Sequence, residues 1–306
     1  MDLVEALRRG DGGFLLFGLT PPKASASGED VARIADLTLE RLRTADPDGV
    51  VLYDITDEGD RNDVERPFPF LPTVDPAQFL ADHLRGWDKP AVVYRSVGKY
   101  PEAELRRWMR DQPADRVVST LVGAASSASV GLTSLARAYD VQREEHPGLL
   151  AGGVVIPERH TNRGDEHVRM LDKQARGCAF FVSQVLYDAN AAKTLVSDYR
   201  DGCDARGVAP RPLVFTVSVC GSTRTLDFLT WLGVQVPRWV RGDLLRAQDT
   251  LVASTEHAAA VAADVVAYCR RLDVPVGLAV ESVSSRRTEI EAAVDLAADL
   301  RALLDG

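Results

Sequence analysis

Ionisable and amide side chains stand at the ends of several short apolar runs of this chain. Asp54, Glu158 and Glu281 each follow such a run closely, and Gln184 and Arg95 end two others. A carboxyl group buried at such a place has a raised pKa and can donate a proton in catalysis. A glutamine amide offers two donors and one acceptor, which suits the edge of a heterocycle. We therefore take the three carboxyl groups as candidate acids, and Gln184 and Arg95 as candidate substrate contacts.

Eight apolar runs recur at similar spacing and must position these residues. They span residues 14–17, 50–53, 91–94, 117–122, 153–156, 179–182, 213–217 and 276–280. Continuous apolarity without polar alternation predicts parallel strands that are buried on both faces. Stretches between the runs carry apolar residues at spacings of three and four, which predicts amphipathic helices. Ser254 or Thr255 is the expected amino-terminal cap of the helix that begins near residue 256.

Eight strands that alternate with helices predict a single (β/α)8 TIM barrel, which we expect to span residues 1–306 as one domain. The competing arrangement is an open doubly wound sheet. Its GxGxxG fingerprint is absent after the first run, as is the GxxxxGK[ST] phosphate loop. Barrel active sites lie at the carboxyl ends of the strands, so the polar residues named above should meet around one mouth.

The remaining polar residues and the cysteines give no clear indication of a functional site. Asp57, Glu58, Asp60 and Asp63 read as a solvated acidic loop, although Asp54 directly continues its strand. Four cysteines without CxxC spacing are expected to be reduced, buried thiols. We expect no metal site, because HExxH is missing and the five histidines show no two-ligand spacing beside a carboxylate.

Composition narrows the class of protein. The 306 residues are 45% hydrophobic and carry a formal net charge of −9, which predicts a globular core and disfavours a nucleic-acid footprint. No run approaches the ~18 apolar residues of a membrane span, and the first residues do not look like a secretory signal. A cytoplasmic protein is therefore expected, without nucleic-acid or membrane partners. A homo-oligomer is compatible with the sequence.

Four stretches carry a resemblance to a known family. They are FGLTPPK at 17–23, GGVVIPERH at 152–160, GCAFFVSQVLYD at 177–188 and GVQVP at 233–237. In this order they resemble the FEFFPP, IPExHP, GAxFxxTQxxFD and GVxIP segments of the methylenetetrahydrofolate reductase family, whose catalytic domain is an eight-stranded barrel. The resemblance implies that Gln184 holds the pterin of a folate and that His160, Glu166 and Lys173 contact a flavin.

The chain departs from this family at several positions. Gly18 stands where the family has its proton-donating glutamate, and Val122-Gly123-Ala124 replaces an RGD turn that holds flavin. Ala91 and Ile156 replace a histidine and a tyrosine that contact flavin. Losing several hydrogen bonds at about 1 kcal/mol each would weaken flavin binding by several kcal/mol. We therefore do not expect FAD to be retained.

The resulting hypothesis is a flavin-independent reductase of one-carbon metabolism that converts 5,10-methylenetetrahydrofolate to 5-methyltetrahydrofolate. NADH or NADPH would give hydride directly, and the sequence does not discriminate between the two. We rank Glu281, Asp54 and Glu158, in that order, as the substitute acid, and expect Phe228 to stack on a flat ring of pterin or nicotinamide. The alternatives are a folate- or pterin-binding barrel without reductase activity, acting as a carrier, regulatory subunit or specialised-pathway component, and an enzyme that uses a deazaflavin.

Overall fold

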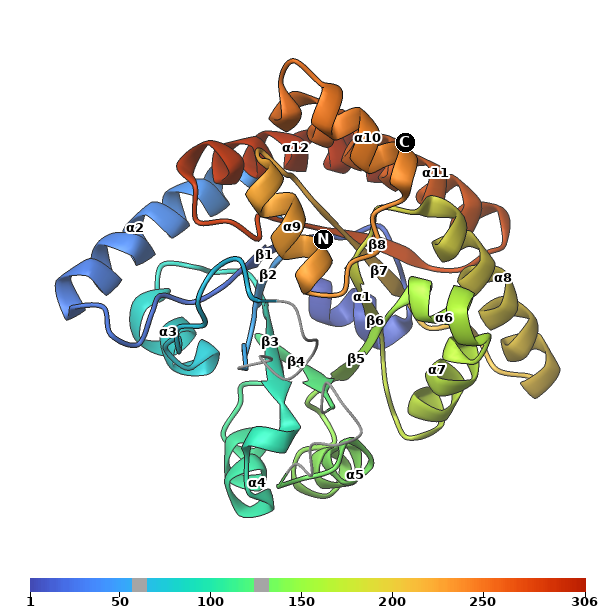
Figure 1. The fold of residues 1–306 in the computed structure, drawn as a ribbon. Helices are drawn as coiled ribbons and strands as arrows, with labels where there is room; N and C mark the ends of the chain where they lie inside the picture. The colour runs from blue at the N-terminus through green and yellow to red at the C-terminus, as the bar shows by residue number, and fades with distance from the viewer. Residues whose placement is uncertain (57–64, 124–131) are drawn as a thin grey trace.

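Eight parallel strands close into a barrel in chain order, surrounded by helices (Figure 1). The computed structural model describes residues 1–56, 65–123 and 132–306. This is the predicted (β/α)8 barrel, and each predicted apolar run overlaps one strand. The strands are β1 (Leu15–Leu19), β2 (Gly49–Leu52), β3 (Ala91–Ser96), β4 (Val117–Val122), β5 (Ala151–Val155), β6 (Phe181–Val185), β7 (Leu213–Ser218) and β8 (Val276–Glu281).

Helices follow the strands as expected, with additions between β5 and β6 and between β7 and β8. The main crossover helices are α2 (Gly28–Ala45), α3 (Pro76–His83), α4 (Glu102–Arg110), α5 (Leu135–Glu145), α8 (Ala189–Arg206), α11 (Thr250–Arg271) and α12 (Arg287–Asp305). A 3-10 turn, η2 (Val97–Lys99), precedes α4, while α6 (Pro157–Arg163) and α7 (Glu166–Ala175) follow β5. Before α11 come α9 (Thr223–Trp231) and α10 (Arg238–Arg246).

The expected cap of α11 was wrong. The helix begins at Thr250, and the Asp249 side chain caps it by accepting from Leu251 and Val252. Ser254 lies buried inside the helix, where its hydroxyl oxygen accepts from the Cys220 amide at 2.8 Å. The apolar stripe is the same for either start, so periodicity did not define the first turn.

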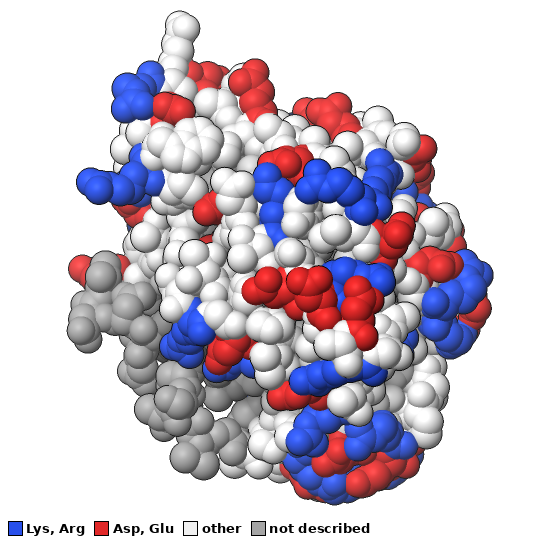
Figure 2. Space-filling model, turned by 90° about the vertical axis from the view of Figure 1, so that its right-hand side faces the viewer, with Lys and Arg blue, Asp and Glu red and all other residues white. Residues whose placement is uncertain are grey.

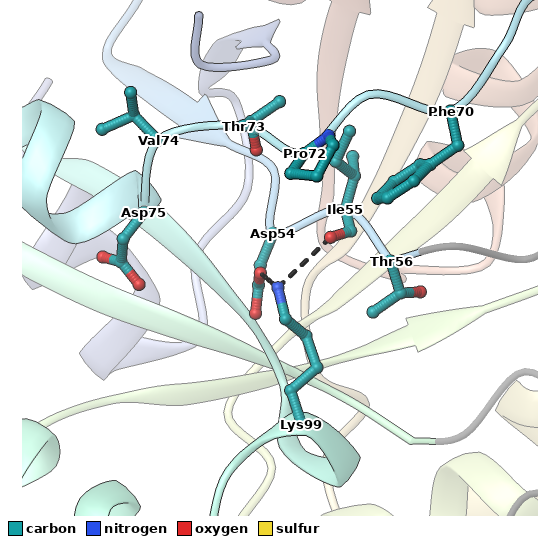
Figure 3. A pocket seen from close by; sticks show the side chains of 9 residues that line it. All are labelled: Asp54, Ile55, Thr56, Phe70, Pro72, Thr73, Val74, Asp75 and Lys99. Atoms are coloured by element: carbon teal, nitrogen blue, oxygen red, sulfur yellow. Dashed lines mark hydrogen bonds and ion pairs between the residues drawn. The ribbon is translucent and has the colours of Figure 1, made fainter. Parts of the chain in front are cut away.

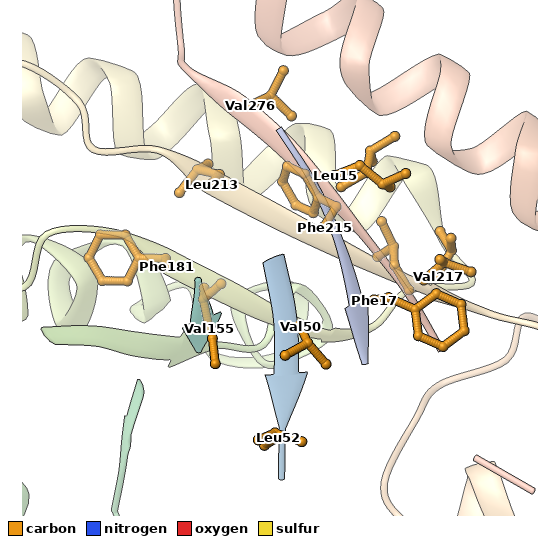
Figure 4. Packing of buried hydrophobic residues seen from close by; sticks show 14 of the residues in the cluster. Leu15, Phe17, Val50, Leu52, Val155, Phe181, Leu213, Phe215, Val217 and Val276 are labelled. Atoms are coloured by element: carbon orange, nitrogen blue, oxygen red, sulfur yellow. The ribbon is translucent and has the colours of Figure 1, made fainter. Parts of the chain in front are cut away.

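Alternate residues of each strand serve two cores. Outward side chains such as Leu15, Phe17 and Val50 pack against the surrounding helices (Figure 4). Inward side chains such as Leu16 and Val51 form the barrel interior. The strand residues are apolar on both faces because helices cover the outside and the opposite strands fill the inside.

A short helix before the barrel, α1 (Leu3–Arg9), was not predicted from the sequence. Its buried Leu3 and Leu7 pack with the inward side chains of the strands and close the amino-terminal end of the barrel. The contact is close, because a methyl group on Gly49, at the start of β2, would lie 2.5 Å from Leu3 Cδ2. The mouth at the carboxyl ends of the strands is therefore the end where a site can form.

Two further expectations concern cysteines and membranes. All four cysteines are free and buried, as predicted. Burial raises the pKa of three of these thiols, Cys178, Cys220 and Cys269, to about 11 or 12. Within the described residues, no helix combines the length and apolarity that crossing a bilayer requires. The acidic residues Asp57, Glu58, Asp60 and Asp63 lie outside the described residues.

Candidate functional site

Glu281 ends β8 with its side chain directed into the barrel. It lies two residues after the inward-facing Ala279, and its neighbour in the register of β1 is Gly18. The exposed fraction of Glu281 is 8%, and its Oε2 has no hydrogen-bond partner among the described residues. Burial raises the pKa of Glu281 to about 7, and a hydrogen bond from Tyr53 offsets only part of this rise. A carboxyl group with this pKa can hold and release a proton near neutral pH.

Three polar side chains accompany Glu281 in the upper barrel. Tyr53 and Tyr94 meet edge-on with ring centroids 4.8 Å apart, and the Glu281 charge further raises the pKa of both phenols. Thr120 is fully buried, lies between the inward-facing Val118 and Val122, and its hydroxyl has no partner in the described part of the chain. The sequence reasoning missed these three residues, although inward alternation along β3 and β4 could have identified Tyr94 and Thr120.

Glu158 is a second buried acid, placed at the start of α6. Its exposed fraction is 3%, and neither carboxyl oxygen has a hydrogen-bond partner within residues 1–56, 65–123 and 132–306. Burial raises the pKa of Glu158 to about 7, with a smaller contribution from the negative charge of Asp188. The structure thus gives Glu158 acid properties similar to those of Glu281, but on β5's side of the barrel rather than beside Gly18.

The Asp54 carboxylate is hydrogen-bonded by three groups of the protein itself. Its carboxylate accepts from the Ser96 amide at 2.9 Å and from the Tyr100 hydroxyl at 2.9 Å. It also accepts from the Lys99 ammonium at 2.5 Å (Figure 3). These bonds tie the end of β2 to the end of β3. Among the three predicted acids, Asp54 is therefore the one that a cation already neutralises, and its geometry suits a structural role.

Arg95 belongs to the same network. Its guanidinium pairs with Asp75 at the start of α3, hydrogen-bonds the Tyr100 hydroxyl at 3.0 Å and lies 4.1 Å from the Trp108 ring centroid. The residue is 3% exposed. The predicted substrate contact is thus buried in an internal cluster, and its partner Asp75, not Arg95 itself, lines the neighbouring cavity.

A cavity of about 380 Å³ opens beside Asp54. Its volume is within the usual range of small-molecule sites. Figure 3 shows its wall running from the end of β2 to the segment before α3. The lining residues are Asp54, Ile55, Thr56, Phe70, Pro72, Thr73, Val74, Asp75 and Lys99.

Gln184 and Phe228 lie on β6 and α9, and both make contacts within the protein. The Gln184 amide nitrogen donates to the Leu232 carbonyl at 2.8 Å, which leaves one N–H and the amide oxygen for a ligand. The Phe228 ring meets Phe68 edge-on at 5.2 Å between centroids, and the Arg66 guanidinium lies 5.5 Å from its centroid. The segment before α3 therefore covers the ring that was expected to stack on a substrate.

The three residues that resemble flavin contacts are engaged inside the protein. Glu166 is fully buried, pairs with the Arg159 guanidinium at 2.6 Å and accepts from the Ile156 amide. Lys173 donates to the Val154 carbonyl at 2.6 Å, and burial lowers the pKa of its ammonium. His160 pairs with Asp198 at 2.9 Å. These contacts link β5, α6, α7 and α8, and they engage the Glu166 carboxylate, the Lys173 ammonium and Nε2 of His160 with protein groups. Ala124, in the replaced RGD turn, lies outside the described residues.

Charged side chains of both signs are present on the face of the molecule that Figure 2 presents. Figure 2 shows basic and acidic groups interspersed over the side of the molecule that it presents. Such mixing is typical of an ordinary solvated surface rather than of a face that binds phosphate backbones.

Comparisons with known proteins place the chain among solved structures. No family model matches it, and no curated protein is significantly similar. An uncharacterised protein from Clostridium thermocellum that binds two copies of 5-methyl-5,6,7,8-tetrahydrofolic acid is 35% identical, with a TM-score of 0.88, and the alignment covers 98% of this chain and 99% of that one. The carboxyl transferase domain of Rhizobium etli pyruvate carboxylase is 12% identical, with a TM-score of 0.50 and coverage of 98% of this chain and 47% of that chain, and shares the fold alone. By its identity and coverage, the chain belongs to the same protein family as the Clostridium thermocellum protein.

Proposed function

We propose that this protein binds a tetrahydrofolate in the barrel mouth and reduces 5,10-methylenetetrahydrofolate to 5-methyltetrahydrofolate, as the methylenetetrahydrofolate reductase family does. Folate binding is supported by the Clostridium thermocellum relative, which binds the compound that this reaction would produce. The reductase step is supported by the sequence resemblance and by one observation above others. That observation is the buried Glu281 carboxyl, which lies beside Gly18 with an unpartnered oxygen.

The proposed chemistry needs an acid near the pterin. The Glu281 proton passes to N10 of the substrate, the bond between N10 and the methylene carbon breaks, and an N5 iminium forms. Hydride from the nicotinamide then reaches the methylene carbon and leaves a methyl group on N5 and an oxidised nicotinamide. Solvent returns a proton to the Glu281 carboxylate, so each cycle consumes one NADH or NADPH and one proton.

The surrounding residues support this assignment in different ways. Tyr53 lies beside the Glu281 carboxyl, and burial raises the pKa of this carboxyl to about 7, so that a large share of it is protonated at neutral pH. Gln184 has one N–H and its amide oxygen for the pterin edge. Direct transfer from the nicotinamide is proposed because the Glu166 carboxylate, the Lys173 ammonium and Nε2 of His160 already contact protein groups. Glu158 remains a candidate for a second proton-transfer group.

A matched pair of variants tests the proposal. Purified protein should lack a flavin spectrum, bind 5-methyltetrahydrofolate, and oxidise NADH or NADPH anaerobically when methylenetetrahydrofolate is supplied. Glu281→Gln should keep folate binding and lose most turnover, because general acids typically contribute about 10²–10⁴-fold. Glu256→Gln, on the exposed face of α11, should match the unchanged protein. Stoichiometric flavin in the purified protein would contradict the direct transfer.

The second candidate is a folate-binding barrel without reductase activity. Two observations favour it. Phe68 packs against the Phe228 ring that was expected to stack on a substrate, and Gly18 stands where the reductase family has its proton-donating glutamate. Folate binding with no nicotinamide oxidation, in both the unchanged protein and Glu281→Gln, would support this candidate over the reductase.

A further inference from the structure

Three chemistry-bearing residues meet on the helical side of the barrel, apart from Glu281 and Gly18. His160 lies on α6, His167 on α7 and Asp198 on α8, and α6 and α7 both pack against α8. Each residue offers one ligand atom, and the three atoms lie within 4.8 Å of one another. Residues that are distant in the chain are therefore gathered by helix packing into a compact set of two imidazoles and a carboxylate.

The histidines are poorly satisfied by the protein itself. His160 is 3% exposed, and its Nε2 lies 2.9 Å from Asp198 Oδ2, whereas its Nδ1 is buried without a hydrogen-bond partner among the described residues. His167 meets His160 edge-on at 5.1 Å between centroids, and its Nδ1 is likewise buried and unpartnered in the part of the chain described. Buried polar atoms without partners are costly, and they are rare unless a ligand, ion or water completes them.

We propose that His160, His167 and Asp198 bind a divalent transition metal ion of the zinc class. Two imidazole nitrogens and one carboxylate oxygen form a set of three protein ligands, which leaves a fourth position for water or another ligand. Magnesium and calcium prefer oxygen-only sites, so the two histidines favour zinc or a similar ion.

Small side-chain movements complete the geometry. Bonds of about 2.0–2.1 Å to a tetrahedral zinc ion place ligand atoms roughly 3.4 Å apart, so a pair at the 4.8 Å limit must draw together by about 1.4 Å. The Asp198 side chain is 46% exposed and has room to rotate. His160 is held between helices, so the metal site would assemble around the fixed His160 ring while the Asp198 side chain rotates toward it.

Zinc titration of the full chain tests the site. After treatment with a chelator and its removal, calorimetry with Zn²⁺ should show one saturable site per chain. His167→Gln and Asp198→Asn should each weaken the affinity at least about 100-fold, since even residues that only support a metal ligand contribute about 10–100-fold. His146→Gln, at the end of α5 and outside the cluster, should bind zinc like the unchanged protein.

Loss of zinc binding in these variants can be distinguished from misfolding and from failure of the proposed folate reaction. Circular dichroism of Asp198→Asn checks folding, because this half-exposed residue is the least demanding of the three to replace. Absence of saturable Zn²⁺ binding, or binding that both cluster variants leave unchanged, would overturn the metal site. Since 5-methyltetrahydrofolate binding is measured on its own, failure of the metal site would leave the proposed function standing.

Discussion

The Glu281 carboxyl occupies the space that a side chain on Gly18 would need. A methyl group at Gly18 would lie 3.0 Å from Glu281 Oε2 and 2.9 Å from the Tyr53 hydroxyl. The two positions are register neighbours on β8 and β1. Glycine on β1 thus makes room for a carboxyl group on the adjacent strand, which is the acid that the proposed mechanism uses.

Gly18→Ala should destabilise the protein by about 1–3 kcal/mol, because the added methyl overpacks a rigid interior. Urea unfolding of the two proteins measures the difference. Combining Gly18→Ala with Glu281→Ala should recover part of the loss, since the second change removes the group that the methyl meets. If Gly18→Ala unfolds at the same urea concentration as the unchanged protein, the close approach described here is incorrect.

The rate of the proposed reduction should fall as pH rises through about 7. Burial raises the pKa of Glu281 to about 7, and only the protonated carboxyl can donate to N10. Anaerobic turnover measured across this range should show the fall in the unchanged protein. The residual activity of Glu281→Gln should lack it, and a retained inflection would assign the titration to another group.

Glu158→Gln should stabilise the protein selectively at neutral and alkaline pH. The pKa of Glu158 is raised from 4.5 to about 7 by folding, so the folded state holds the proton more tightly and loses stability as pH rises between these values. Glutamine avoids this loss, which amounts to at most roughly 3 kcal/mol above pH 7. Unfolding curves at about pH 4 and about pH 8 test the difference, which should vanish at the lower pH.

Asp54→Asn should cost about 2–3 kcal/mol, because the carboxylate holds three donors at the junction of β2 and β3. Asp243→Asn is a suitable control, as that carboxylate is 61% exposed and pairs only at the surface. Thermal unfolding compares the two. A large loss of turnover with unchanged stability in Asp54→Asn would instead make Asp54 the acid and remove Glu281 from that role.

The barrel was predictable because strands buried on both faces leave a plain signature. Val117–Val122 matches β4 from end to end, and the carboxyl ends of such strands had to bring Glu281 and Gly18 to one mouth. The hydrogen-bond and ion-pair partners of individual side chains were harder to predict from the sequence. Arg95 lies one residue before the end of β3, close to the expected position, but its pairing with Asp75 depends on how the segment before α3 returns to the barrel.

Contacts between helices could not be predicted from the sequence, because they depend on how the helices pack. His160 and Asp198 are 38 residues apart, so their contact follows from the angle at which α6 meets α8 and not from any local spacing. The same reason explains why the proximity of His160, His167 and Asp198 could not be predicted from their spacing in the chain. The short α1 was missed because Leu3 and Leu7 make sense as buried residues only once a barrel end exists to receive them.

Helix α1 also determines from which end of the barrel a ligand can enter. With α1 packed against the inward side chains that fill the barrel interior, ligands can approach only from the mouth at the carboxyl ends of the strands. In the proposed reaction, the folate and the nicotinamide would both have to enter through this mouth, and we propose that one lies deeper than the other. The deeper partner has to arrive first and depart last, so steady-state kinetics of the reductase should follow a compulsory order.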